Sequence, residues 1–246
     1  MAKVAGRHPV LELLKGPRKV HRVLIQHSAG GDNIEKIVEE AKKRSIPVER
    51  TTEREVSDLS ELDNHQGVVA LADDIDLKDP EEVVKAVKAG GGTPRLLLLD
   101  QIKDPQNFGA LARTARAAGY QGVIYPGDRS CPITPAVVKA SAGAVEYLAM
   151  CKITNLNRKI KALKDLGLWI AGADPEGDEV YYSADLTGPL GIVIGSEGSG
   201  LRRLVKENCD FLIRVPVRKC PGSLNASAAA AVLIYESLRQ SAGNLD

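Results

Sequence analysis

The sequence predicts an α/β protein built on a mostly parallel sheet with helices on both faces. Two observations lead to this prediction. Short apolar runs alternate with helical patterns along most of the 246 residues, which is typical of parallel strands joined by right-handed crossovers. The run Leu96–Leu99 is apolar at every position, as expected for a strand covered on both faces. The length fits one large domain or two unequal ones.

The composition predicts a division into two domains and a linker. We expect a first domain over residues 1–74, a flexible linker over residues 75–93 and a larger domain over residues 94–246. The acidic stretch Asp73–Asp76 and the triple glycine Gly90–Gly92 mark this boundary. Because a glycine run frees the backbone, we expect the two domains to move relative to each other.

The first domain is predicted to alternate helices and strands around a small sheet. Asp32 has the residue type of an N-cap, and the apolar positions that follow it have helical spacing. The run Gly67–Ala72 reads GVVALA and has the composition of a strand. The predicted helices are His8–Lys15, Asn33–Arg44 and Glu53–Leu59, and the predicted strands are Val20–Ile25, Ser45–Glu49 and Gly67–Ala72.

The larger domain is predicted to contain the main parallel sheet. Its strands are Leu96–Leu99, Gly122–Tyr125, Tyr147–Cys151, Leu168–Ala171, Leu190–Ile194 and Phe211–Val215. Its helices are Gln106–Ala118, Pro135–Ser141, Asn155–Leu166 and Ser223–Gln240, the last of them rich in alanine, a strong helix former.

Charge and aromatic content limit the partners that the chain can bind. The 33 basic and 32 acidic side chains leave a net charge of +1, which excludes a protein that coats nucleic acid through bulk charge. Aromatic residues make up 4%, so a platform on which bases stack is not expected. A basic stretch near the N-terminus is either a nucleic-acid-binding patch or a solvated helix face. Its candidate binding residues are Arg7, Lys15, Arg18, Lys19 and Arg22.

Cysteine spacing and hydropathy indicate the cellular setting. The four cysteines lie far apart and form no C-x-x-C pair, so we expect neither a metal cluster nor a disulfide framework. A reducing, cytoplasmic setting follows as the default. No apolar run approaches the ~20 residues that cross a bilayer, and the charged N-terminal stretch does not resemble a secretory signal, so we expect no membrane association.

The candidate chemistry lies in three clusters of the larger domain. The first contains Asn107 and Arg113, six positions apart on a predicted helix and therefore not strictly on one face. The second is the glycine-rich turn Ile194–Gly200, which reads IGSEGSG and does not have the spacing of a dinucleotide-binding loop. The third joins Val215 and Pro216 to a helix start at Ser223–Asn225.

Each cluster taken alone also has a purely structural interpretation. Asn107 has the position of a helix-start residue, and Arg113 that of a surface cation. The glycine loop can be a tight turn, and Ser223 an N-cap.

Together and in this order, the motifs resemble the SpoU family of RNA ribose 2′-O-methyltransferases, part of the SPOUT or α/β-knot superfamily. The residues are N-x-G-A-x-x-R from Asn107 to Arg113, I-G-S-E-G-x-G from Ile194 to Gly200, and V-P followed by S-L-N within Val215–Asn225. At the front, GRHPV (Gly6–Val10) and NHQGVVA (Asn64–Ala70) resemble the small ribosomal-protein-like RNA-binding domain of one branch. The closest type is the bacterial 23S rRNA guanosine-2′-O-methyltransferase, and the resemblance spans nearly the whole chain.

The resemblance implies a fold, a cofactor and an assembly. The larger domain is expected to form a parallel sheet whose C-terminal segment threads through a loop, making a trefoil knot of a kind that is otherwise nearly absent from proteins. S-adenosylmethionine is expected to bind in the knot near Gly195, Val215 and Leu224. A homodimer is expected to form through the knotted domains, and no metal is expected.

The resemblance also implies the catalytic set, which is Asn107, Arg113, Glu197, Ser223 and Asn225. A guanidinium has a pKa above ~12 and stays charged, so we expect Arg113 to hold a phosphate and stabilise developing negative charge rather than act as a base. The other four residues are expected to orient Arg113, the substrate and the cofactor.

One loop departs from the family pattern. Between Pro216 and Ser223, Lys219 stands where a glycine is usual and Pro221 is added, which puts the path of the loop in doubt. Arg218 and Lys219 either contact RNA phosphates or are solvated.

The expected function is therefore 2′-O-methylation of a 23S rRNA guanosine. The alternatives are methylation of a tRNA guanosine, methylation of rRNA ribose of the antibiotic-resistance type, and a non-catalytic RNA-binding or ribosome-assembly role. The motif residues Asn107, Arg113, Glu197 and Asn225 argue against the last alternative.

Overall fold

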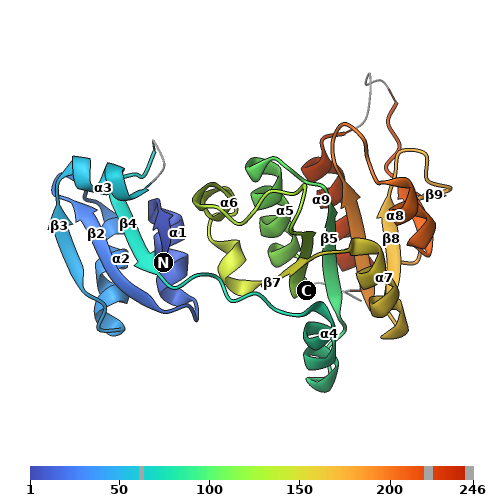
Figure 1. Ribbon diagram of the computed structural model, residues 1–246, viewed down its shortest axis with the longest axis horizontal. Coiled ribbons are helices and arrows are strands. Elements are labelled where there is room, and N and C mark those ends of the chain that lie inside the picture. Colours follow the sequence, from blue (N-terminus) through green and yellow to red (C-terminus); the bar gives the residue numbers. More distant parts are fainter. Residues whose placement is uncertain (61–63, 219–223, 242–246) are drawn as a thin grey trace. The chain divides into compact units, whose positions relative to one another are not determined.

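The computed structural model describes residues 1–60, 64–218 and 224–241, which divide into two compact units (Figure 1). Unit 1 comprises Met1–Asp76 and Ile133–Tyr147, and unit 2 comprises Leu77–Pro132 and the chain from Leu148 onward. Among the described residues, no helix is both long and apolar enough to cross a membrane.

Unit 1 contains a four-stranded sheet in the order β1-β4-β2-β3. β4 pairs antiparallel with β1 and β2, and β2 pairs parallel with β3. The strands are β1 (Ala2–Ala5), β2 (Val20–Gln26), β3 (Val48–Thr51) and β4 (Val68–Ala72). The helices are α1 (Arg7–Lys15), α2 (Asp32–Lys43), α3 (Glu53–Ser60), α6 (Pro135–Ala140) and the 3₁₀ helix η1 (Ala144–Tyr147).

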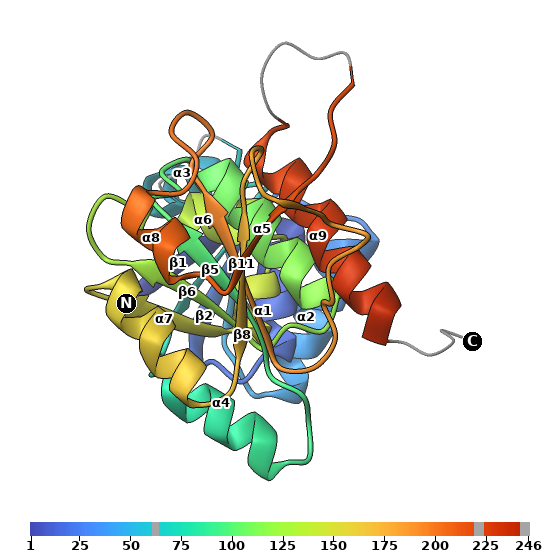
Figure 2. The same ribbon diagram turned by 90° about the vertical axis from the view of Figure 1, so that its right-hand side faces the viewer.

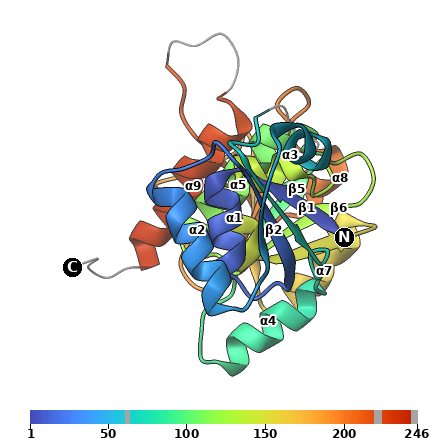
Figure 3. The same cartoon turned by 90° about the vertical axis from the view of Figure 1, so that its left-hand side faces the viewer.

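Helices cover both faces of this small sheet. On one face, Val56 of α3 packs with Leu24 of β2 and Val69 of β4. Because successive strand residues point to opposite faces, the buried Val23 and Ile25 of β2 face the other side. There α1 contacts β1 and β4, and α2 lies beside α1 (Figure 3).

Unit 2 is built on a seven-stranded sheet in which every pair of neighbouring strands is parallel. The strand order is β7-β6-β5-β10-β8-β11-β9. The strands are β5 (Arg95–Asp100), β6 (Gly122–Pro126), β7 (Ala149–Ile153), β8 (Trp169–Ala173), β9 (Glu179–Val180), β10 (Leu190–Gly195) and β11 (Phe211–Arg214). The helices are α4 (Pro80–Ala89), α5 (Pro105–Ala117), α7 (Leu156–Asp165), α8 (Arg203–Asn208) and α9 (Ala226–Ser241).

Two layers of helices bury the central strands of unit 2 (Figure 2). Helices α4, α7 and α8 contribute Val84, Ile160 and Val205 to one apolar cluster with the sheet. On the other face, α5 and α9 pack against each other. Tyr120 and Arg95 anchor α9, since the Tyr120 hydroxyl lies 2.8 Å from Ser237 Oγ and Arg95 donates to the Ser237 carbonyl at 3.0 Å. In the sheet itself, β10 lies between β5 and β8, although both of these strands precede it in the chain.

The predicted α/β class and parallel sheet are confirmed, and the element bounds differ in several places. Helix α2 begins after Gly31, so Asp32 is its first residue and not its N-cap. Strand β3 starts at Val48 rather than Ser45. The predictions missed β1, β9, α8 and the 3₁₀ helix η1. β9 has only 2 residues, and α8 has no side-chain N-cap, so neither of these two leaves a clear pattern in the sequence.

Part of the predicted linker is a packed helix. Residues 80–89 form α4, which begins with Pro80 and is capped by the Asp79 carboxylate, an acceptor from the Glu81 and Glu82 amides. The side chain of Val84 is fully buried in the core of unit 2. This apolar contact attaches the helix to unit 2, and unit 2 accordingly begins at Leu77.

Candidate active site

The site begins where two neighbouring strands end at the same edge of the sheet. Gly195, the last residue of β10, pairs in register with Asp100, the last residue of β5. Loops that follow parallel strands meet at this edge, where ligands of α/β proteins commonly bind. After β5, the Asp104 carboxylate accepts a 3.0 Å hydrogen bond from the Asn107 amide and caps α5. This cap fixes Asn107, which is 9% exposed, in the first turn of the helix.

Three predicted catalytic residues from three separate motifs form one hydrogen-bonded group, which we call the polar triad: Asn107, Glu197 and Asn225. Asn107 Nδ2 donates to Glu197 Oε1 at 2.9 Å. Asn225 Nδ2 donates to Asn107 Oδ1 at 3.1 Å and also to Glu197 Oε1. A carboxylate that accepts from two amides is held in a fixed orientation.

The helix α9 holds one member of the polar triad in place. Asn225 Oδ1 accepts hydrogen bonds from the Ser227 amide at 2.9 Å and from the Ala228 amide at 3.2 Å, as an N-cap does. Asn225 therefore caps α9 with its oxygen while its amide nitrogen donates into the triad. The predicted cap and catalytic residue Ser223, together with Lys219 and Pro221, lies outside the described residues.

Arg113 is not part of this group. It lies on α5 with its side chain exposed, and it forms no hydrogen bond or ion pair within the portion of the chain that the structure describes. The offset of six positions from Asn107 accounts for this separation, as the sequence pattern predicted. The guanidinium is available to a ligand from outside this chain.

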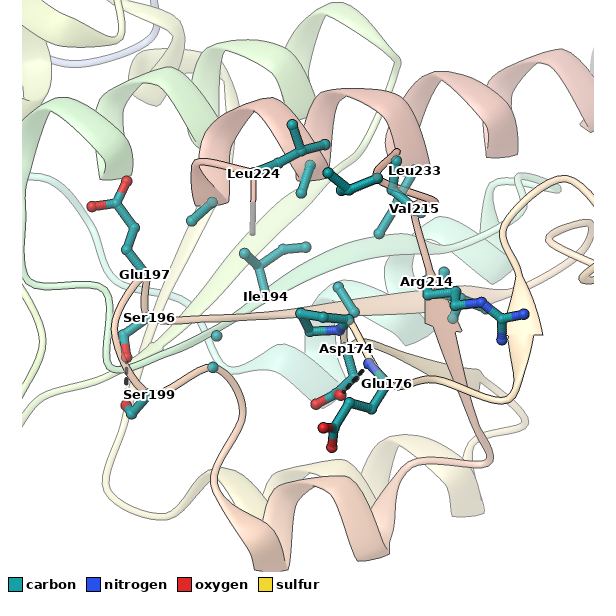
Figure 4. A pocket seen from close by; sticks show the side chains of 18 of the residues that line it. Asp174, Glu176, Ile194, Ser196, Glu197, Ser199, Arg214, Val215, Leu224 and Leu233 are labelled. Carbon is teal, nitrogen blue, oxygen red and sulfur yellow. Dashed lines mark hydrogen bonds between the residues drawn. The ribbon is translucent and has the colours of Figure 1, made fainter. Parts of the chain in front are cut away.

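A cavity of about 630 Å³ lies beside the polar triad, and we call it the strand-end cavity (Figure 4). The three predicted cofactor-binding residues, Gly195, Val215 and Leu224, all line it. In Figure 4, Val215, Leu224 and Leu233 lie on one side of the cavity, and Asp174 and Glu176 lie on the opposite side. The volume is within the range that holds a nucleoside-sized ligand, and the two walls suit a ligand with an apolar and a polar part.

The glycine loop is shaped by close contact between its own ends. The Gly200 amide donates to the Ser196 carbonyl at 2.8 Å, and Gly200 has a φ of +63°, a conformation that glycine adopts readily. A Cβ at Gly195 would collide with the backbone of Gly200 and Leu201. At Gly198, a Cβ would meet nothing within 4 Å. Of Gly195 and Gly198, only Gly195 is therefore required by the backbone packing of the loop.

A buried ion pair that the sequence analysis did not identify supports the loop. Asp100 is 0% exposed, and its carboxylate accepts from the Arg202 backbone amide at 2.9 Å and from Arg202 Nε at 2.8 Å. Arg202 lies two residues after Gly200, the last residue of the glycine loop, so this pair attaches the loop to the end of β5. The signal in the sequence was a carboxylate after four leucines, but its partner lies 102 positions away.

The described cysteines do not have the properties of catalytic nucleophiles. Burial raises the pKa of Cys151 and of Cys209 to about 12, and burial raises the pKa of Cys131 above its usual value. These thiols are therefore protonated at neutral pH. Within residues 1–60, 64–218 and 224–241, no group of three or more His, Cys, Asp and Glu side chains could hold a metal ion.

The basic residues of unit 1 differ in their surroundings. Lys15 pairs with Glu12 at 2.9 Å, Arg22 pairs with Glu49 at 3.4 Å, and Lys19 is exposed. Arg7 donates from Nε to the Gln66 carbonyl at 3.2 Å.

Arg18 is engaged within unit 1. Its guanidinium lies 2.5 Å from the Glu146 carboxylate, and the two side chains are 8% and 1% exposed. A guanidinium buried in this way has no free face for a phosphate, so we remove Arg18 from the residues expected to contact RNA. Burial raises the pKa of Glu146, and the nearby Arg18 charge opposes that shift.

Comparison with known proteins gives full-length matches. Residues 94–235 match the SpoU rRNA methylase family, and residues 3–76 match the family described as RNA 2′-O ribose methyltransferase substrate binding. A Bacillus subtilis protein provisionally named as the TrmH family tRNA/rRNA methyltransferase YacO is 37% identical over 96% of this chain and 95% of its own. The Coxiella burnetii 23S rRNA (guanosine-2′-O-)-methyltransferase RlmB is 38% identical, with the same coverage of 96% and 95%.

A solved structure shows the same fold. The crystal structure of the SpoU methyltransferase AviRb from Streptomyces viridochromogenes, in complex with AdoMet, superimposes with a TM-score of 0.79 at 22% identity. It covers 97% of this chain and 89% of that one. With the two family matches, this fold and site define an RNA methyltransferase. The chain belongs to the SpoU rRNA methylase family.

Proposed function

We propose that this enzyme transfers a methyl group from S-adenosylmethionine to the 2′-hydroxyl of a guanosine ribose in 23S rRNA. The observation that carries the proposal is the polar triad, held by hydrogen bonds beside the strand-end cavity. The choice of a 23S rRNA guanosine is supported by the Coxiella burnetii relative, which bears that activity in its name and matches 96% of this chain. Membership of the family also implies the trefoil knot.

The methyl donor is S-adenosylmethionine, and the strand-end cavity suits it. The side chains of Val215 and Leu224 offer an apolar wall, and Gly195 exposes backbone where a side chain could not be placed. Backbone amides and carbonyls can then form hydrogen bonds with an adenine ring. When bound, the cofactor supplies an electrophilic methyl group on a sulfonium.

The loop geometry predicts a specific defect for Gly195→Ala. The added Cβ collides with backbone at Gly200 and opens the turn, so the affinity for S-adenosylmethionine should fall at least ~10-fold, or about 1.4 kcal/mol. Calorimetric titration with S-adenosylmethionine measures this loss. Gly198→Ala, in the same loop but with open space around its Cβ, should bind as the wild type does. Equal affinities for all three proteins would mean that the loop does not shape the cofactor site.

The protein's own residues position the reactants. Holding the ribose hydroxyl in line with the methyl group can provide much of the rate acceleration. The cationic guanidinium of Arg113 binds the phosphate of the target nucleotide and stabilises negative charge that develops on the 2′-oxygen. The polar triad orients the nucleotide and the cofactor, and Ser223 is proposed to assist it.

The first domain, residues 1–74, is proposed to capture the RNA. Arg7, Lys15, Lys19 and Arg22 supply positive charge for phosphates. The predicted glycine hinge has no part in this proposal, because residues 90–92 lie between α4 and β5, inside unit 2, and do not join the two units. A ribosomal RNA substrate implies a cytoplasmic enzyme that participates in rRNA processing.

A homodimer through the knotted domains completes the proposal. Within the described residues of one chain, Arg113 forms no hydrogen bond or ion pair with the polar triad. A two-fold assembly brings the same surface of both copies together, and it would allow Arg113 to act in a site shared between two chains.

The decisive test measures transfer from radiolabelled S-adenosylmethionine to protein-free 23S rRNA, 16S rRNA and bulk tRNA. Label in 23S rRNA alone, recovered in alkali-resistant dinucleotides, is the expected result because a 2′-O-methyl group blocks alkaline cleavage. Label in tRNA would favour the second candidate, which the tRNA/rRNA name of the Bacillus subtilis relative supports. Absence of both label and cofactor binding would leave a non-catalytic RNA-binding protein.

A further inference from the structure

Unit 1 contains a second cavity, of about 670 Å³, which we call the amide cavity. Polar groups dominate its lining, in contrast to the apolar wall of the strand-end cavity. Side chains with hydrogen-bonding groups come from Arg7, His8, Gln26, Asn33, Asn64 and Gln66. No step of methyl transfer uses these residues.

Two sequence motifs that the catalytic site does not use meet at the amide cavity. They are Gly6–Val10 and Asn64–Ala70. The Arg7 amide donates to Gln66 Oε1 at 2.9 Å, and Arg7 Nε donates to the Gln66 carbonyl at 3.2 Å. The Gly6 amide donates to the Val68 carbonyl at 3.2 Å. These contacts hold the start of α1 against the start of β4 and form one wall of the cavity.

The cavity is preformed by close backbone packing. Gly67 has a φ of +76°, and a Cβ there would lie 2.7 Å from the Ala29 Cβ. The buried His65 accepts from the Gly67 amide at 3.1 Å through Nδ1, and its Nε2 lies 3.0 Å from Ser57 Oγ. A ligand therefore meets walls whose geometry is already fixed, which reduces the entropy cost of binding.

Two side-chain amides at the cavity are not engaged elsewhere. Within the described parts of the chain, the side-chain amide groups of Asn33 and Asn64 form no hydrogen bond. Each amide offers donors and an acceptor together, the combination that recognises the edge of a nucleobase. The Glu53 carboxylate, which accepts from Gln26 Nε2 at 3.3 Å, also lines the cavity and favours the amino group of a base over a second phosphate.

We propose that the amide cavity binds one unpaired base of the RNA substrate, with Arg7 at the adjoining phosphate. This inference rests on the proposed function, because it requires RNA as the substrate. Sequence-specific recognition of RNA usually targets bases that are free of a duplex. Since aromatic residues make up only 4% of the chain, recognition by hydrogen bonds replaces stacking here.

The test compares neutral and charged substitutions in equilibrium binding to a 23S rRNA transcript. Asn33→Ala/Asn64→Ala should weaken binding at least ~10-fold without changing the dependence of log K on log salt, since no charge is removed. Arg7→Ala should weaken binding and reduce that slope by about one. Lys42→Ala, which removes an exposed charge at the opposite end of α2 from Asn33, is the matched control and should have the smaller effect. A double variant that binds within twofold of the wild type would overturn the proposal.

Crosslinking identifies the bound group. Ultraviolet crosslinking of the wild-type protein to the transcript, followed by mass spectrometry, should link peptides that line the amide cavity to an unpaired nucleotide. Links from these peptides to duplex nucleotides alone would contradict the proposal. An unchanged thermal midpoint shows that the double variant is folded.

The outcomes separate this inference from the proposed function. If the wild type methylates RNA and the double variant binds RNA normally, only the cavity proposal fails. If the wild type methylates no RNA and the double variant still loses RNA binding, the cavity proposal stands and the proposed function fails.

Discussion

Replacing Arg113 with alanine is expected to reduce kcat for 23S rRNA methylation by about 10²- to 10³-fold, the usual cost of removing one group that stabilises developing charge. The affinity for S-adenosylmethionine should not change, because Arg113 does not line the strand-end cavity. The fold should also be preserved, since the side chain is exposed and has no partner among the described residues. Initial rates at saturating RNA and calorimetry with the cofactor measure the two quantities separately.

Two further variants test whether charge alone is sufficient. Arg113→Lys keeps the charge but loses the planar fork that binds phosphate through two bonds, so it should recover only a small part of the rate. Arg116→Ala removes the same charge from the next turn of α5 and should keep nearly full activity. An Arg113→Ala enzyme with the wild-type kcat would exclude Arg113 from the catalytic set.

Mixing two impaired variants, at a concentration of S-adenosylmethionine too low to fill the cavity of Gly195→Ala, tests whether Arg113 acts across a dimer. If the site combines the cavity of one chain with Arg113 of the other, then mixed dimers of Arg113→Ala and Gly195→Ala contain one intact site. Random exchange makes half of the dimers mixed, so about a quarter of the wild-type sites should return. If Arg113 acts within its own chain, each site of a mixed dimer still lacks either Arg113 or an intact cavity, so mixing should restore no activity. A second comparison, in which wild-type subunits are diluted into the double variant Arg113→Ala/Gly195→Ala, tests the same distinction independently.

That dilution distinguishes the two arrangements. If Arg113 acts across the interface, a mixed dimer of wild-type and double-variant subunits has no complete site, and activity falls with the square of the wild-type fraction. If Arg113 acts within its own chain, activity falls in proportion to that fraction.

The fold class could be predicted from the sequence because buried parallel strands appear as short, continuous apolar runs. Leu96–Leu99 lies within β5, where every residue is buried, and α5 (Pro105–Ala117) differs by one residue at each end from the predicted helix Gln106–Ala118. Strand β9 could not be predicted, because its two residues acquire their structure only by pairing with β11. Likewise, nothing local indicates that β10 lies between β5 and β8.

The residues of the site could be predicted from their sequence motifs, but the contacts between these residues could not. Asn107, Glu197 and Asn225 could be selected from the sequence, yet their hydrogen bonds span 90 and 118 positions and exist only in the folded chain. The same limit explains Arg18, whose charge resembled an RNA contact until its partner Glu146, 128 positions away, was placed. Charge is visible in a sequence, whereas the partner of a charge is not.

The ion pair between Asp100 and Arg202 predicts an asymmetry in stability. Asp100 is 0% exposed, whereas the Arg202 side chain is 42% exposed. Arg202→Ala leaves a buried carboxylate without its countercharge and should lower the free energy of unfolding by about 3–5 kcal/mol. Asp100→Asn leaves a cation that water can solvate and keeps a group that accepts from the Arg202 amide, so it should cost clearly less.

The double variant Asp100→Asn/Arg202→Ala isolates the cause of this asymmetry. It removes the buried charge together with its partner, so it should be more stable than Arg202→Ala alone, although one side chain more has been changed. Thermal or denaturant unfolding of the four proteins measures these differences, and Arg203→Ala, an exposed neighbour paired with Glu207, is the control. If Arg202→Ala and Arg203→Ala were equally stable, the pair would not support the loop. Because the pair joins the glycine loop to the end of β5, Arg202→Ala should also bind S-adenosylmethionine more weakly. In the double variant, the regained stability should be accompanied by a partial recovery of the affinity for S-adenosylmethionine.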